Sequence, residues 1–160
     1  IIKGSSGADN VTLGEAVSGA NIDLGAGSDK LTLTGSNTLT VSNVESITGG
    51  SGNDLLTLAA GITNGSIDLG AGNDALTLAN STNSLTASNV ESITGGSGND
   101  TVTVNALSND GTITVNLGAG TDTLIVLGNA NVSATGVENW RGGDTDDVLV
   151  MKSRIIGGTV

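Results

Sequence analysis

A glycine-rich turn that ends in aspartate recurs seven times in this chain and constrains its fold more than any other feature. The copy at Gly49 reads GGSGNDLLTL, a six-residue turn followed by a short segment with apolar residues at alternate positions. The turns start at positions 4, 24, 49, 69, 95, 117 and 142. Their mean spacing of roughly 23 residues is typical of a unit that cannot bury its apolar face alone. The recurrence therefore predicts a repeat architecture of stacked copies.

Two adjacent repeats form a longer, two-repeat unit of about 46 residues. Its first half carries a GG-type turn, with VESITGGSGND at Val44 and Val90 and a degenerate copy, VENWRGGDTDD, at Val137. Its second half carries an LG-type turn, as in NIDLGAG at Asn21 and SIDLGAG at Ser66.

The residues after each turn alternate as in a half-buried strand, and no segment has a helical period. With 26 glycines and one Trp as the only aromatic residue, the small apolar side chains suit a thin, stacked interior. We therefore expect an all-β, right-handed parallel β-solenoid of about seven coils, each of roughly 23 residues with one glycine/aspartate turn. Residues 1–160 should form one continuous segment of a longer chain.

A two-edged roll is the alternative, with the GG-type turns along one edge and the LG-type turns along the other. It would need uninterrupted half-coils between the turns, and Gly61 and Gly65 interrupt one of these stretches. One turn per coil is therefore the preferred arrangement.

The chain carries a net charge of -11, from 16 acidic against 5 basic residues. Nucleic-acid binding needs clustered Lys and Arg, so the charge argues against it and favours cations as partners. Cysteine is absent, which excludes disulfides and thiolate metal sites. No apolar run approaches the roughly 20 residues of a membrane span.

The turns offer only oxygen ligands, because glycine lets carbonyl oxygens point into the loop and the closing aspartate adds a carboxylate. Flexible, anionic, all-oxygen sites are typical of calcium. The candidate ligands are the closing residues Asp9, Asp29, Asp54, Asp74, Asp100, Asp122 and Asp147. The turn glycines that would supply carbonyls are Gly25, Gly27, Gly50, Gly52, Gly70, Gly72, Gly96, Gly98, Gly118 and Gly120.

Stacked carboxylates about 5 Å apart would repel by roughly 1 kcal/mol in water and by about 3 to 4 kcal/mol at an effective dielectric constant of 20. Five basic residues cannot neutralise every gap, so we expect up to six calcium ions between successive turns. The alternative is an Asx-type turn that caps the strand without metal. Glu45, Glu91 and Glu138 are interpreted as surface carboxylates, and Asp23 and Asp68 as outward side chains, with extra cation binding as the alternative.

The motif GGxGxDxLx, matched by GGSGNDLL at Gly49 and GGSGNDTV at Gly95, resembles the calcium-binding repeat of RTX proteins, which are exported bacterial proteins. LGAGSDKL, LGAGNDAL and LGAGTDTL depart from it only at the first glycine. The resemblance implies that carboxylates and turn carbonyls bind calcium between stacked coils, and that folding follows export by type I secretion. The usual RTX coil holds two such nonapeptides, whereas the spacing here is longer.

The chain lacks His, Cys and Tyr, and its acidic turns are alike, whereas a catalytic centre should be one irregular place. We therefore do not expect an enzyme. The composition is similar to that of RTX-bearing surface-layer proteins and large adhesins. It predicts a calcium-stabilised structural segment of a secreted bacterial cell-surface protein that self-associates or continues into further repeats. The alternative is the RTX module of an exported enzyme or toxin whose active domain lies outside this segment.

Overall fold

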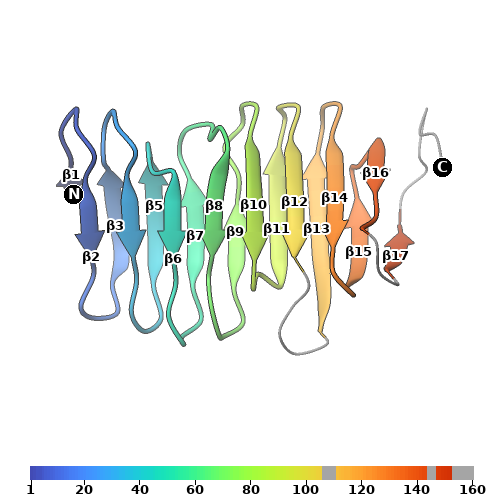
Figure 1. Ribbon diagram of the computed structural model, residues 1–160, viewed down its shortest axis with the longest axis horizontal. Helices are drawn as coiled ribbons and strands as arrows, with labels where there is room; N and C mark the ends of the chain where they lie inside the picture. Colours follow the sequence, from blue (N-terminus) through green and yellow to red (C-terminus); the bar gives the residue numbers. More distant parts are fainter. Residues whose placement is uncertain (106–110, 144–146, 153–160) are drawn as a thin grey trace.

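A computed structural model describes residues 1–105, 111–143 and 147–152, and within these ranges the chain forms only strands and turns. The 17 strands make two parallel sheets, and the chain passes alternately from one sheet to the other (Figure 1). The right-handed parallel β-solenoid expected from the sequence is confirmed. No described residue belongs to a helix that could cross a membrane.

The nine-stranded sheet contains, in spatial order, β1 (Ile2–Lys3), β3 (Ser18–Asp23), β5 (Thr38–Ser42), β7 (Leu55–Leu58), β9 (Ala75–Thr77), β11 (Ser92–Gly96), β13 (Thr112–Gly118), β15 (Asn131–Thr135) and β17 (Val148–Met151). The eight-stranded sheet contains β2 (Asn10–Thr12), β4 (Lys30–Thr32), β6 (Ser46–Thr48), β8 (Gly65–Asp68), β10 (Ser84–Ser88), β12 (Thr101–Asn105), β14 (Thr123–Leu127) and β16 (Asn139–Arg141).

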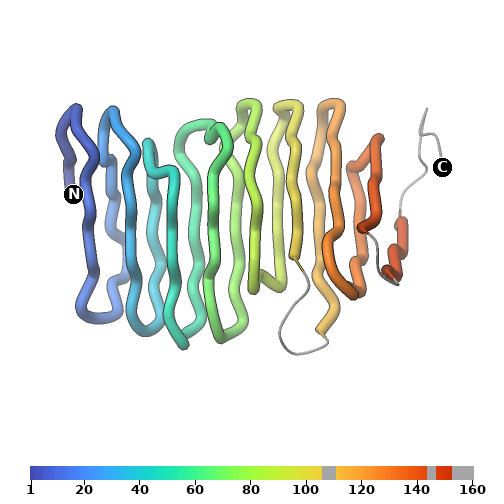
Figure 2. The backbone as a smooth tube through the Cα atoms, in the orientation of Figure 1, coloured from blue at the N-terminus to red at the C-terminus, as the bar shows by residue number. Residues whose placement is uncertain are grey.

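The coils are on average shorter than the spacing of the glycine turns, so the expected coil length of roughly 23 residues is wrong, although no coil holds more than one glycine/aspartate turn. Stacked positions are 16 residues apart at Asp29 and Glu45 and 22 residues apart at Asp100 and Asp122, and the strand pairings fall within this range. Each coil therefore holds two strands and reverses direction twice (Figure 2). In Figure 1, turns that lead into the eight-stranded sheet form the upper edge, and turns that lead back form the lower edge.

The two-repeat unit of the sequence contains five strands, which is an odd number. As a result, β5 (TLTVS) lies in the nine-stranded sheet and its sequence counterpart β10 (SLTAS) lies in the eight-stranded sheet. Equivalent turns of successive units consequently lie on opposite edges. Neither arrangement considered from the sequence has this property.

The core lies between the two sheets, in columns of aliphatic side chains that repeat with the coils. Leu31, Leu56 and Val102, which follow their turns, are at most 1% exposed, and the predicted inward alternation is confirmed for them. Parallel strands stand about 4.8 Å apart, so equivalent side chains of neighbouring coils pack directly on one another. Small aliphatic residues can therefore fill the thin interior.

Strand β7 provides a matched test of this core, because Leu56 is 1% exposed whereas its neighbour Leu55 is 47% exposed. We expect Leu56→Ala to lower the free energy of unfolding by about 2 to 5 kcal/mol, since it removes buried methyl groups and leaves a cavity. Leu55→Ala should change it by only about 0.5 kcal/mol. Urea unfolding of both variants measures the difference, and equal losses would contradict the assignment of the inward face.

Candidate metal-binding turns

Six of the seven glycine turns meet in three stacked pairs, and in each pair the second member is the LG-type turn, one coil later. The first pair (4–9 with 24–29) and the third (95–100 with 117–122) lie on the upper edge, whereas the second (49–54 with 69–74) lies on the lower edge. Backbone amides of Ala26, Ala71 and Ala119 donate to the carbonyls of Ser5, Gly50 and Gly96 at 3.2, 2.9 and 3.0 Å. A single file of seven turns with up to six gaps is therefore wrong; three gaps lie between two glycine turns.

The closing aspartates of these turns point inward. Asp29, Asp54, Asp74, Asp100 and Asp122 are at most 2% exposed, and the Oδ1 atom of each accepts the backbone amide of the equivalent residue one coil earlier. The distance is 2.6 Å from the Asp54 amide to Asp74 Oδ1 and 2.7 Å from the Asp9 amide to Asp29 Oδ1. Each carboxylate thus lies in the gap that precedes its own turn.

The second carboxylate oxygen of all five residues is buried and makes no hydrogen bond within the described part of the chain. A buried acceptor without a partner costs roughly 1 to 3 kcal/mol, and more when it is charged. Such an atom calls for a bound proton or a cation.

Asp9 and Asp147 differ from these five residues because their carboxylates fold back onto their own turns. Asp9 Oδ2 accepts the Ser5 amide at 2.7 Å, and Asp147 Oδ2 accepts the Gly143 amide at 3.0 Å. Both bonds reach back four residues within the turn, so they differ from the Asx-type turn considered as the metal-free alternative. Part of the last turn, residues 144–146, lies outside the described residues.

The predicted glycines allow the turns to approach one another closely. Gly70 has φ +84°, and a Cβ atom there would fall on the Gly50 carbonyl oxygen. At Gly72 the added Cβ would lie 2.6 Å from the Gly52 carbonyl oxygen and 3.0 Å from Asp74 Oδ1, so these oxygens face the same point. The same positive φ and close approach occur at Gly25, Gly27, Gly118 and Gly120, whereas Gly50, Gly52, Gly96 and Gly98 pack against the turn one coil earlier.

The three glutamates are not free surface carboxylates, which corrects their interpretation from the sequence. Oε2 of Glu45, Glu91 and Glu138 accepts the backbone amide of the closing aspartate one coil earlier, at 2.8, 2.6 and 2.7 Å. They also do not form one column of every second coil, because Glu91 lies on the lower edge and the other two on the upper edge. Each glutamate closes the gap that follows a pair of glycine turns.

Sequence reasoning missed Asn37 and Asn83, which precede the first closing aspartate of the second and third pairs. Their backbone amides donate to Asp54 Oδ1 and Asp100 Oδ1 at 2.8 and 3.0 Å. The two residues occupy equivalent positions in successive two-repeat units and stand immediately before a strand, as the closing aspartates do. This position before a strand could have identified the two asparagines from the sequence. They were missed because the turns that contain them lack the glycine motif.

Asp23 and Asp68 lie outside the gaps, on the outer surface of the coils. Their Oδ1 atoms accept the side-chain amides of Asn43 and Asn89 at 2.7 and 2.8 Å. The hydrogen bond from Asn43 lowers the pKa of Asp23. Asn43 and Asn89 have φ of 54° and 53°, a conformation that asparagine adopts more readily than most residues.

Burial and neighbouring carboxylates perturb the second aspartate of the stacked pairs. Desolvation raises the pKa of Asp74 to about 6, assisted by the charges of Asp54 and Glu91. Desolvation and the charges of Asp100 and Glu138 likewise raise the pKa of Asp122. Ionised carboxylates are therefore disfavoured at these positions without a compensating positive charge.

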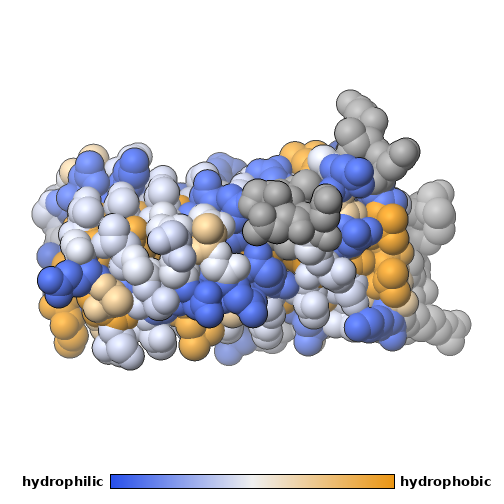
Figure 3. Space-filling model, turned by 90° about the horizontal axis from the view of Figure 1, so that it is seen from below, coloured by the Kyte–Doolittle hydropathy of each residue, from blue (hydrophilic) through white to orange (hydrophobic). Residues whose placement is uncertain are grey.

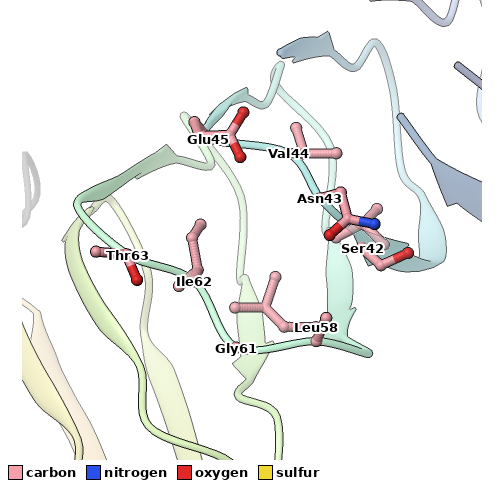
Figure 4. A pocket seen from close by; sticks show the side chains of 10 residues that line it. Ser42, Asn43, Val44, Glu45, Leu58, Gly61, Ile62 and Thr63 are labelled. Atoms are coloured by element: carbon pink, nitrogen blue, oxygen red, sulfur yellow. The ribbon is translucent and has the colours of Figure 1, made fainter. Parts of the chain in front are cut away.

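The upper edge is interrupted between the first and third pairs by a cavity of about 190 Å³. Residues 42–45 line one side, and Leu58 and residues 60–63 line the other (Figure 4). Along the upper edge, side-chain oxygens accept backbone amides of the preceding coil as far as Glu45. The next such acceptor is Asn83 Oδ1, which accepts the Ile62 amide at 3.4 Å. The cavity lies between these two series of hydrogen bonds.

The turns fit a calcium ion in donor chemistry. Each of the five buried carboxylates keeps one buried oxygen without a partner, and every donor is oxygen. The other oxygen, Oδ1 of Asp29 and of Asp74, lies near the carbonyl oxygen of Gly7 or Gly52 in the turn one coil earlier. Within the described ranges no three acidic side chains converge on one point, so carbonyl oxygens would supply the remaining ligands. The lower edge, seen in Figure 3, is mainly hydrophilic, and hydrophobic colour gathers toward the ends of the rod.

Comparison with protein-family models, with curated proteins and with solved structures found no match to this chain.

The close approach of the turns predicts which glycines are indispensable. Gly70→Ala should lower the free energy of unfolding by at least about 1 kcal/mol, because alanine disfavours positive φ and its Cβ would meet the Gly50 carbonyl. Gly14→Ala is the matched control, since nothing lies within 4 Å of an added Cβ there. Urea unfolding checks both variants, and equal stability would refute the stacked-turn geometry.

The raised pKa of Asp74 predicts a pH dependence in the absence of divalent cations. An unfolded aspartate titrates near a pKa of about 3.9, so between about pH 4 and about pH 6 the folded chain holds more protons than the unfolded chain. Stability should therefore fall as the pH rises through this interval. Asp74→Asn should make this fall shallower, as measured by urea unfolding in chelator; an unchanged slope would contradict the assignment.

Proposed function

We propose that this chain is a calcium-stabilised structural repeat segment, of the RTX type, from a secreted bacterial cell-surface protein. One observation carries the proposal: Asp29, Asp74 and Asp122, each buried between two stacked glycine turns, retain a carboxylate oxygen without a partner. A bound cation supplies the positive charge and the electrophilic partner that these oxygens lack.

The protein's own cations do not serve this purpose. The described basic side chains, Lys3, Lys30, Arg141 and Lys152, are all exposed, whereas the carboxylates lie at most 2% exposed inside the turns. A net charge of -11 adds a general repulsion that opposes the compact state. Divalent cations from the medium would neutralise the buried carboxylates and also reduce the repulsion that arises from the net charge.

Calcium is the cation that the donors favour. Carboxylate and carbonyl oxygens suit hard cations, and the flexible geometry of glycine turns suits calcium better than magnesium, which requires near-ideal octahedral sites. The residues that would hold it are Asp29, Asp74 and Asp122, each with the carbonyls of the two glycine turns that form its gap. Calcium would supply charge neutralisation there.

A structural role fits the repetition. The three gaps repeat one arrangement along a rod, and repetition suits a spacer better than a catalytic centre. Because calcium is scarce in the cytoplasm and abundant outside the cell, folding coupled to calcium would follow export. Such a rod would serve as a structural segment of a surface layer, a filament or an adhesin.

Asp74→Asn provides a test of the proposal, because its effect on the free energy of unfolding should have opposite signs in chelator and in calcium. Asparagine keeps the Oδ1 acceptor for the Asp54 amide but removes the buried charge. At neutral pH in chelator we expect the variant to be more stable than the parent. In about 5 mM calcium, well above the weak affinities of extracellular sites, we expect it to be less stable because one ion is lost.

Asp68→Asn is the control, since Asp68 is exposed and its Oδ1 acceptor for Asn89 is also retained. It should change stability little in either condition. Urea unfolding, followed by circular dichroism, measures all three proteins. A parent that calcium does not stabilise after exhaustive chelation, or an Asp74→Asn effect of the same sign in both conditions, would sink the proposal.

A further inference from the structure

Two gaps lie between a turn of different sequence and the first glycine turn of a stacked pair. Turn 33–37 (LTGSN) lies one coil before turn 49–54, and turn 78–83 (LANSTN) lies one coil before turn 95–100. A Cβ on Gly52 would lie 2.5 Å from the carbonyl carbon of Gly35, so turns 33–37 and 49–54 are in direct contact. These gaps contain the carboxylates of Asp54 and Asp100.

The side-chain amide of Asn37 fills the first of these gaps. Asn37 is 3% exposed, and its Nδ2 donates to Asp54 Oδ1 at 2.9 Å, to the Gly35 carbonyl at 2.9 Å and to the Thr34 carbonyl at 3.3 Å. One electropositive group therefore lies between a carboxylate and two carbonyl oxygens of a turn. These are the donor types that a cation would take.

Asn83 repeats this arrangement on the opposite edge. It is fully buried, and its Nδ2 donates to Asp100 Oδ1 at 2.8 Å, to the Ser81 carbonyl at 2.6 Å and to the Ala79 carbonyl at 3.0 Å. The recurrence in the next two-repeat unit, on a different edge and in a turn of different sequence, shows that the amide is a regular part of the unit.

We propose that the side-chain amides of Asn37 and Asn83 take the place of a cation in these two gaps and thereby decide which gaps bind an ion. The inference rests on the proposed calcium binding. The gaps of Asp29, Asp74 and Asp122, where no amide intervenes, take one ion each. The gaps of Asp54 and Asp100 take none, because the amide already occupies their turn carbonyls.

Replacing the amide by a carboxylate should convert a filled gap into an ion site. In Asn37→Asp the amide donor is lost, and a second carboxylate stands beside Asp54, whose buried Oδ2 has no partner. We expect Asn37→Asp and Asn83→Asp each to bind one calcium ion more than the parent, as counted by native mass spectrometry of the full chain. Asn21→Asp, at an exposed position within β3, adds the same charge outside any gap and should leave the count unchanged.

A second pair of variants keeps the inference testable if an added carboxylate prevents folding. Asp74→Asn should lower the ion count by one, whereas Asp54→Asn should leave it unchanged. An unchanged count in Asn37→Asp and Asn83→Asp, or a loss of one ion in Asp54→Asn, overturns the inference while leaving calcium binding intact. A parent that binds no calcium overturns the proposed function itself.

Discussion

The coils are joined along both edges by one recurring hydrogen bond, in which a side-chain oxygen accepts the backbone amide of the equivalent residue one coil earlier. Asparagine, aspartate and glutamate all provide this acceptor, at Asn37, Asp54, Asp74 and Glu91 in turn along the lower edge. The bond satisfies an amide that the turn would otherwise leave without a partner. It also fixes the register of the strands that follow, so the sheets and the aliphatic columns depend on it.

The residues on the two sides of a gap distinguish three kinds of gap. Where asparagine stands one coil before the aspartate, its side-chain amide donates to the aspartate and occupies the carbonyl oxygens of its own turn. Aspartate between two glycine turns brings a buried charge and a free oxygen. Glutamate, with its longer side chain, reaches the same amide from a shorter turn and remains partly exposed. Buried carboxylates without an amide beside them are therefore confined to the three gaps between glycine turns, where a bound cation would neutralise their charge.

This division has consequences for how bound cations would stabilise the rod. The three gaps between glycine turns lie on alternating edges and are separated by intervening coils, so each would bind its ion as a local event. The stacked aliphatic core transmits stability from one coil to the next, as in other repeat proteins. Cation binding at a few gaps could thus stabilise the whole length of the solenoid.

Several features could be predicted from the sequence because they depend on local chemistry. The inward alternation of residues such as Leu56, the closing aspartates and the positive φ of Asn43 follow from side-chain pattern and backbone sterics. The roles of Asn37 and Glu45 could not be predicted, since their partners, Asp54 and Asp29, become neighbours only when the coils stack.

The sequence by itself determined a parallel β-solenoid with oxygen-rich turns, because these properties repeat within each short unit. The tertiary structure decided which turns meet. Asn43 to Glu45 reverse the chain between β5 and β6 without glycine or proline, so the two-repeat unit holds five strands. An odd number of strands sends each successive pair of GGSGND-type and LGAGND-type turns to the opposite edge. Six of the seven turns therefore form three pairs, in place of a single file.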